Sequence, residues 1–202
     1  MEHTNNIITL RGELVELPEF SHENHGRLFY RFELNVPRLS GNVDTLPVIA
    51  EGSLLEEMDL SGGDMIAVTG QIRSHNIRPA GIRRLLIFVF AAAVSAEDGE
   101  PFNHVLLEGP LCREPSYRRT PLGREICDAM LAVPRAFRRA DYIPCILWGR
   151  TAQEISHCHT RDHIRICGRL QSRRYTKLTE DGPLERVAYE VSALSGEYVP
   201  EL

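Results

Sequence analysis

The chain has 202 residues, of which 43% are hydrophobic and 25% charged, a composition that is ordinary for a folded globular protein and argues against wholesale disorder. The N-terminus, MEHTNNIITL, lacks the basic and apolar regions of a secretory signal. The longest apolar run, residues 85–94, is shorter than a membrane helix requires. We therefore expect a cytoplasmic protein without a membrane partner.

The net charge of −5 is divided unevenly along the chain. Residues 1–101 hold 8 Arg and 15 acidic residues, a net charge of −7, whereas residues 102–202 hold 14 Arg and one Lys against 13 acidic residues, a net charge of +2. Arginine favours planar, bidentate and stacking contacts. A polyanion should therefore prefer the second half.

The sequence repeats itself at a spacing of 97 residues. The matching pairs are NIITLRGEL (6–14) with NHVLLEGPL (103–111), LNVPR (34–38) with LAVPR (131–135), DTLPVIAEG (44–52) with DYIPCILWG (141–149) and, after a slip of one residue, GDMIAVTGQIRS (63–74) with RDHIRICGRLQS (161–172). The segment SAEDGEP (95–101) between the copies has the composition of a linker. We predict two domains, residues 1–96 and 97–202.

Each copy reads mostly as β-strands. In the second copy, alternating or apolar runs are separated by turn signals and lie at 105–111, 124–136, 141–149, 163–175 and 187–194. A short helix is expected over residues 151–159, with its counterpart at 53–60 in the first copy. Five strands with a helix between the third and fourth are typical of the OB-fold barrel, so the predicted fold class is all-β, with one short helix per unit and two tandem OB-folds. Another small barrel or sandwich is the alternative.

Aromatic and basic residues interleave in the second copy. Side chains alternate along a strand, so Ile143, Cys145 and Leu147 should face the core while Tyr142 and Trp148 face outward. Single-stranded nucleic acids are bound in this way, with bases stacked on rings and phosphates matched by cations. The predicted stacking residues are Phe137, Tyr142, Trp148 and Tyr175, and the predicted phosphate contacts are Arg118, Arg119, Arg135, Arg138, Arg139, Arg150, Arg173, Arg174 and Lys177. Taken singly, each has a structural alternative: Trp148 in an interface, the tyrosines as ordinary strand residues, the arginines as a solvated hairpin tip.

The first copy serves as an internal control. In the same register, Ser40, Thr45, Glu51 and Ile77 replace the four aromatic residues, while the core positions keep their apolar character. Residues that the fold requires should persist in both copies. A set that diverges together indicates a task that only the second copy performs, and we expect the first copy to be structural and oligomerising.

The segments NHVLLEGPL, DYIPCILWGRTAQ and IRICGRLQSRRYTK resemble the bacterial single-stranded DNA-binding protein family. The resemblance covers nearly all of residues 103–192 and is confined mainly to core positions in the first copy. It implies binding of single-stranded DNA with little sequence preference, by stacking on the four aromatic residues named above, in replication, repair or recombination. It also implies a nucleoid-associated homodimer that presents four OB-folds.

One departure concerns the C-terminus. Family members end in an acidic tail with a terminal aromatic residue that recruits replication and repair proteins, whereas the present sequence ends SGEYVPEL. We do not expect recruitment through such a tail. The alternative function is an OB-fold protein–protein accessory module of a replication or primosome complex, which would use the aromatic face for a protein.

Other chemistry has weaker support. His157, Cys158, His159 and His163 gather in one segment and suit zinc, but no matching second ligand pair is evident, and polar residues at a helix end are the favoured explanation. The odd number of cysteines and the lack of a CxxC pair favour free, buried thiols. Without a G-x-S-x-G, P-loop or H-E-x-x-H motif, we expect neither an enzyme nor a cofactor.

Overall fold

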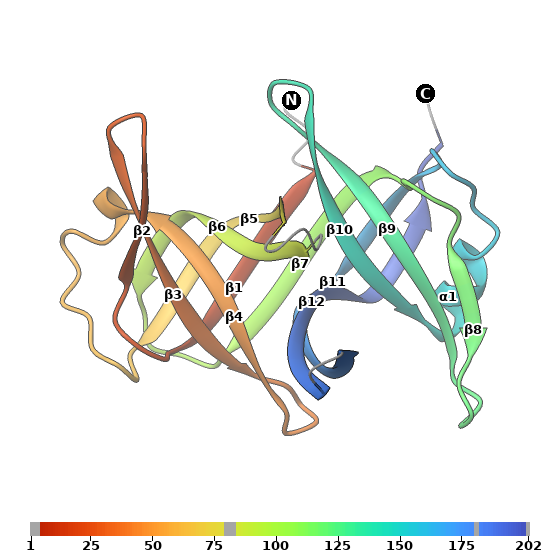
Figure 1. The fold of residues 1–202 in the computed structure, drawn as a ribbon, viewed down its shortest axis with the longest axis horizontal. Coiled ribbons are helices and arrows are strands. Elements are labelled where there is room, and N and C mark those ends of the chain that lie inside the picture. Colours follow the sequence, from red (N-terminus) through yellow and green to blue (C-terminus); the bar gives the residue numbers. More distant parts are fainter. Residues whose placement is uncertain (1–4, 79–83, 180–181, 201–202) are drawn as a thin grey trace.

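The computed structural model describes residues 5–78, 84–179 and 182–200, and two β-barrels lie side by side in it (Figure 1). The elements are β1 (Asn6–Leu14), β2 (Glu19–Asn24), β3 (Arg27–Pro37), β4 (Val43–Glu51), the 3-10 turn η1 (Gly52–Leu54), β5 (Met65–Ile77), β6 (Arg84–Ala96), β7 (Phe102–Pro110), β8 (Ser116–Arg119), β9 (Glu125–Arg135), β10 (Arg139–Trp148), α1 (Gly149–Ile155), β11 (His163–Thr179) and β12 (Gly182–Tyr198).

Five strands close the first barrel. Strand β1 pairs antiparallel with β5 and, at its end, with β3. Strands β3 and β4 pair antiparallel, β5 and β6 pair antiparallel, and β4 meets β6 in parallel at Val48 and Val89. This closed order, with one parallel contact between the third and fifth strands, is the OB-fold arrangement.

The second barrel repeats this topology with β7, β9, β10, β11 and β12. Its parallel contact joins Cys145 of β10 to Val191 of β12, and a bridge between Leu111 and Leu131 closes the barrel. The predicted fold class, two tandem OB-folds, is therefore confirmed. Two strands were not anticipated: β2 and β8 each form a hairpin with the following strand, β3 and β9 respectively, and they lie at the two ends of the twelve-stranded sheet.

The helices differ from expectation in the first half. Helix α1 forms at the predicted place in the second half, over Gly149–Ile155, but the first half has only the 3-10 turn Gly52–Leu54. A longer helix there would carry Glu56, Glu57 and Asp59 at its C-terminal end. Negative charge is unfavourable at that end of the helix dipole, so the segment continues as a loop.

Alternation along the strands builds the core. The predicted core residues of β10, Ile143, Cys145 and Leu147, are buried, as are their counterparts Leu46, Val48 and Ala50 in β4. Burying one large aliphatic side chain contributes about 1.5–3 kcal/mol. The same core positions therefore stabilise both barrels, as the repeat predicts.

The two barrels are joined through their first strands. Strands β1 and β7 pair antiparallel, with Asn6 opposite Leu107 and Leu10 opposite Asn103. Residue 103 occupies the position of residue 6 in the repeat, and residue 107 that of residue 10. The two pairs are therefore equivalent, as in the interface of a twofold-symmetric dimer. The Asn6 side chain forms two hydrogen bonds of 2.8 Å with the backbone of Ile72, and Asn103 forms the matching pair with Leu170.

A second reciprocal contact connects the halves through two buried aspartates. Asp44 of the first half accepts hydrogen bonds from the backbone N–H and hydroxyl of Ser172 at 2.6 and 3.0 Å. Asp141 of the second half accepts hydrogen bonds from the backbone N–H and hydroxyl of Ser74 at 2.8 and 3.4 Å. Each carboxylate is only 1% exposed and is paired with arginine. We call these contacts the aspartate latches.

Two glycines allow the longest hairpins to bend. The register of β5 with β6 shifts at Thr69 and Gly70, and that of β11 with β12 shifts at Cys167 and Gly168. A Cβ at either glycine would collide with a carbonyl oxygen of the partner strand. The β-bulges bend each hairpin so that one strand can close the barrel while its tip reaches toward the other half.

Candidate functional site

All four predicted stacking residues lie exposed on the second half. Phe137 is 94% exposed in the loop between β9 and β10, Tyr142 is 44% exposed, and Trp148 and Tyr175 are each 38% exposed. The core residues that alternate with Tyr142 and Trp148 are at most 3% exposed. The rings are therefore displayed on the outer face and are not part of the barrel core.

Trp148 is held in place by its neighbours in the sheet. It ends β10, and its indole Nε1–H donates to the Ser192 hydroxyl at 3.1 Å. In register it lies opposite Ile126 of β9, which in turn lies opposite Arg118 of β8, so the three side chains share one face. The next residue, Gly149, has a φ of 54°, which lets the chain turn from the strand into α1. The ring is thus fixed with one edge bonded and one face free.

One residue on this face differs from expectation. Ile146 alternates with the core residues of β10, so the strand pattern puts it on the same face as Tyr142 and Trp148, yet it is only 7% exposed. Like Cys145, it lies where β10 is paired on both sides, here with Asp128 of β9 and Ser192 of β12. Ile146 is therefore in the interior of the sheet and not at its edge.

The loop that carries Phe137 has an unusual backbone. Phe137 and Arg138 have φ values of 61° and 54°, in the left-handed region that non-glycine residues seldom adopt. The loop is a short connection between paired strands, since Arg135 and Arg139 are opposite each other. This conformation projects an aromatic ring and cations at the tip of the β9–β10 hairpin.

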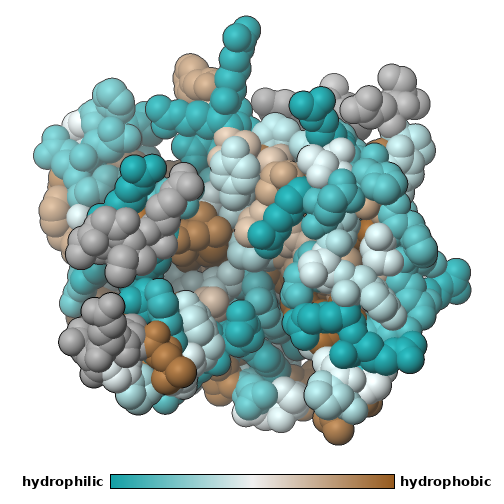
Figure 2. Space-filling view, turned by 45° about the vertical axis from the view of Figure 1, so that its right-hand side comes forward, coloured by the Kyte–Doolittle hydropathy of each residue, from teal (hydrophilic) through white to brown (hydrophobic). Residues whose placement is uncertain are grey.

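Tyr175 lies on the long β11–β12 hairpin and lines a groove between the two halves. The Arg173 guanidinium carbon is 5.5 Å from the centre of the Tyr175 ring. The groove has a volume of about 720 Å³ and is also lined by Pro144, Lys177 and Arg186. Pro144 alternates with Tyr142 and Trp148 on β10, so the groove continues their face. In the space-filling view, hydrophilic side chains surround hollows in which hydrophobic atoms are visible (Figure 2).

The predicted phosphate contacts fall into two classes. Five of the nine predicted cations are paired with acidic residues: Arg118 with Asp128, Arg119 with Glu125, Arg135 with Asp141, Arg150 with Glu154 and Arg173 with Glu190. Within the described parts of the chain, no ion pair is found for the other four, which are Arg138, Arg139, Arg174 and Lys177. These four cations are exposed.

The pairing of the other arginines affects their chemistry. Hydrogen bonds to Asp128 and Glu125 raise the pKa values of Arg118 and Arg119, which therefore stay charged. Arg135 belongs to an aspartate latch, with its Nη1 at 3.3 Å from the buried carboxylate of Asp141. Arg135 therefore lies at the interface between the halves and is less available to a phosphate than the exposed cations.

The cysteine and histidine segment is built differently from a metal site. Cys158 is buried, and burial raises the pKa of its thiol, whereas His159 bonds to Glu114 at 3.2 Å on the surface. Among the described residues, no group of three or more His, Cys, Asp or Glu side chains could hold a metal ion. The cysteines are free thiols, and burial raises the pKa of Cys127 to about 11.

The equivalent face of the first half has different chemistry. Thr45 donates a hydrogen bond to Asn35 at 2.8 Å, and Glu51 is paired with Arg27 at 3.2 Å. Ser40 and Ile77 offer no ring either. The first half therefore has no aromatic residue at these four positions.

Three cations that line the groove were not among the residues predicted from the sequence. Arg31 and Arg84 of the first half, together with Arg186 of β12, line the groove beside Tyr175. Nothing in the repeat indicates Arg31 or Arg84, because they reach the groove only when the halves are joined. Arg186 lies opposite Tyr175 in the β11–β12 hairpin, a register that the sequence pattern does not give.

Comparisons with known proteins identify relatives of this chain. Residues 102–195 match the model of the Single-strand binding protein family. The single-stranded DNA-binding protein B of Bacillus subtilis is 36% identical over 81 residues, which cover 37% of this chain and 72% of that protein. The single-stranded DNA-binding protein 1 of Staphylococcus aureus is 38% identical over 80 residues, 36% of this chain and 48% of that protein. The chain thus spans about half the length of most curated relatives it matches.

The likeness extends to both halves in three dimensions. The wild-type single-stranded DNA binding protein from Thermus aquaticus superposes with a TM-score of 0.80 at 23% identity, covering 97% of this chain and 93% of that one. At this identity the likeness concerns the fold. No helix in the described part of the chain is long and apolar enough to cross a membrane.

Proposed function

Because the chain belongs to the single-strand binding protein family, we propose that it binds single-stranded DNA with little sequence preference, through residues 97–202. The observation that carries this proposal is the set of four exposed rings, Phe137, Tyr142, Trp148 and Tyr175, at positions where the other half has none. Exposed apolar groups that gather on one surface often mark a binding site, and every base offers a face on which a ring can stack.

The path of the strand follows from where the rings and cations lie. Bases stack on Trp148 and Tyr142 along β10 and continue to Tyr175 on the β11–β12 hairpin, with Phe137 at the hairpin tip. The phosphates are neutralised by four exposed cations: Arg138, Arg139, Arg174 and Lys177. Arg118 lies in the same row as Trp148 and can exchange Asp128 for a phosphate, because this ion pair is exposed and weak.

Residues 1–96 have a structural and oligomerising role in this proposal. Two chains would present four OB-folds, as the family resemblance implies, and the processes served would be replication, repair or recombination. Light scattering of the purified protein tests the assembly: a mass of twice 22.9 kDa supports the homodimer, and a mass of 22.9 kDa contradicts it.

The chain has a single tryptophan, which makes the stacking role directly measurable. Oligo(dT) is titrated into the protein at low salt while the fluorescence of Trp148 is followed. Stacking should quench the fluorescence in a saturable way. Binding detected by anisotropy of a labelled oligo(dT) without quenching would remove Trp148 from the interface, and a lack of binding at low salt would overturn the proposal.

The substitution Trp148→Ala completes this test. It should weaken binding of labelled oligo(dT) by about 1–3 kcal/mol, the cost of one lost base–ring stack. Arg165→Ala is a suitable control in the same half, because Arg165 is paired with Glu108 and Glu197 at 2.8 and 3.0 Å. This control should bind as the unaltered protein does.

A further inference from the structure

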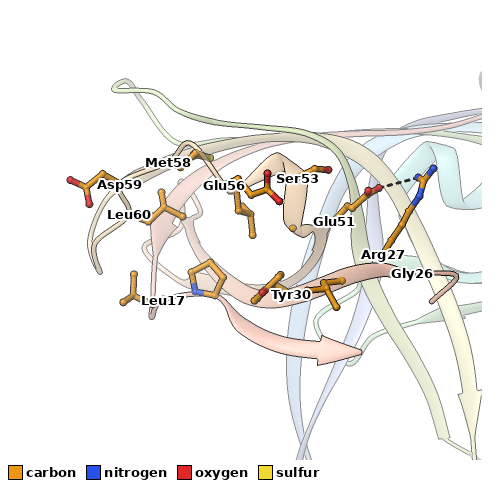
Figure 3. Close-up of a pocket in the computed structure, with 14 residues that line it drawn as sticks. Leu17, Gly26, Arg27, Tyr30, Glu51, Ser53, Glu56, Met58, Asp59 and Leu60 are labelled. Atoms are coloured by element: carbon orange, nitrogen blue, oxygen red, sulfur yellow. Dashed lines mark hydrogen bonds and ion pairs between the residues drawn. The ribbon is translucent and has the colours of Figure 1, made fainter. Parts of the chain in front are cut away.

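A pocket of about 680 Å³ opens in the first half (Figure 3), and none of the four exposed rings lines it. It lies between the start of the β2–β3 hairpin and the loop that follows β4. Its apolar walls are Leu17, Leu28, Tyr30, Leu55, Met58 and Leu60. Leu17 and Leu28 are 56% and 45% exposed, so the pocket has open apolar surface that the core does not use.

Acidic residues surround these walls. Glu51, Glu56 and Asp59 line the pocket together with a single cation, Arg27. Arg27 and Glu51 are paired at 3.2 Å at one end of the pocket, whereas Asp59 lies at the other end beside Leu60 (Figure 3). The net charge of the lining is negative. Such a pocket repels phosphate and favours an apolar group with cations around it.

At the matching place in the second half, a hydrogen bond joins the two sides. In the register of the repeat, Leu28 corresponds to Glu125 and Glu56 to Gln153. Gln153 Nε2 donates to Glu125 Oε2 at 2.7 Å, which ties α1 to β9. Leu28 cannot form this bond with Glu56, so the corresponding gap stays open in the first half. The lining of this pocket therefore differs from the corresponding residues of the second copy.

We propose that this pocket binds a partner protein through a peptide segment that carries a bulky apolar side chain flanked by Lys or Arg. The apolar side chain would enter between Leu28, Tyr30 and Met58, and the basic residues would meet Glu56 and Asp59. A volume of this size accommodates one or two large side chains. The proposal does not depend on DNA binding by the second half, and it leaves that face free.

Selection from a random peptide library tests the proposal without assuming a sequence. A phage-displayed library of random dodecapeptides is selected on the unaltered full-length protein. Recovered sequences should contain a large apolar residue with Lys or Arg on both sides, and synthetic versions should bind saturably in fluorescence anisotropy. A library that yields no saturable binder, or only acidic binders, would overturn the proposal.

Substitutions then locate the binding site. The double change Leu28→Glu with Glu56→Gln installs the pair that is hydrogen-bonded in the second half, and Glu56→Arg reverses one charge of the rim. Each change should raise the dissociation constant of the selected peptide at least about tenfold. Binding of oligo(dT) should be retained, which also shows that the variants are folded. Undiminished peptide binding, or displacement of the peptide by oligo(dT), would place the peptide elsewhere and contradict the inference.

Discussion

The two halves of this chain have the same fold but differ in the chemistry of their surfaces. In the second half, Tyr142 and Trp148 are exposed on β10, and Arg138 and Arg139 are exposed at its start, whereas Thr45 and Glu51 hold the positions of the two rings in the first half. The core residues and the aspartate latches are matched in both. Residues that the OB-fold requires are kept in both halves, because neither barrel can fold without them. Residues that only a ligand requires can be lost from one half of a duplicated chain.

The largest expected effect concerns a feature that the halves share. Asp141→Ala removes the buried acceptor of Arg73, Arg135 and Ser74, and should lower the free energy of unfolding by about 3–5 kcal/mol. Asp44→Ala should cost a similar amount, since its latch is the symmetric counterpart. Urea unfolding followed by circular dichroism measures both.

An exposed ion pair provides the control for the latches. Asp128→Ala removes the partner of Arg118, and both side chains of that pair are well exposed. A loss of about 0–1 kcal/mol is expected. If Asp141→Ala costs no more than Asp128→Ala, the latches do not hold the halves together.

Part of this architecture could be predicted from the sequence. The alternation in DYIPCILWG was enough for the core stripe and the outward direction of Tyr142 and Trp148. The repeat and the strand pattern indicated two equivalent β units, and the family resemblance favoured the OB-fold over another small barrel. The latches were present in the repeat as the paired Asp44 and Asp141, but they look like ordinary strand-end residues. Their function depends on the other half, and a pattern within one unit contains no information about that contact.

The limits of prediction have the same physical origin at the candidate site. The sequence identifies cations but not their partners, so Arg135 and Arg138 look equivalent although the first is paired with Asp141 and the second is exposed. Strands β2 and β8 are short, and their residues are mostly exposed, so they lack the alternating burial that marks a strand. The groove beside Tyr175 forms from both halves and has no signature in either.

The second prediction uses salt to compare the surfaces. The double change Arg138→Ala with Arg139→Ala should reduce the slope of log K against log salt by about 1.4, because each phosphate contact on a single strand contributes about 0.7. Arg27→Ala in the first half should leave the slope unchanged. Binding titrations of oligo(dT) at several salt concentrations provide the slopes.

Arg84→Ala sharpens the same comparison. Arg84 belongs to the first half but lines the groove that contains Tyr175. We expect an unchanged slope, because the proposed interface lies within residues 97–202. A slope that falls by about 0.7 would show that Arg84 contacts a phosphate and that the first half also binds DNA.

The smallest effect concerns pH. Hydrogen bonds from Arg119, Gln153 and Tyr117 hold the pKa of Glu125 below its usual value. A lowered pKa in the folded state stabilises the protein above the unfolded pKa of about 4.3, and this stabilisation is lost as the pH falls through the folded pKa. Glu125→Leu introduces the residue of the first half and should flatten the loss of melting temperature between about pH 5 and pH 3. An identical pH profile in the variant would show that the hydrogen bonds of Glu125 with Arg119, Gln153 and Tyr117 do not stabilise the folded protein.

The most direct test of the difference between the halves compares one pair of equivalent positions, residues 142 and 45. Both Tyr142→Ala and Thr45→Ala keep Trp148, so oligo(dT) binding is followed by the same fluorescence signal. Tyr142→Ala should weaken binding by about 1–3 kcal/mol, and Thr45→Ala should leave it unchanged. Equal losses at the two positions would show that both halves bind DNA alike and would contradict the account.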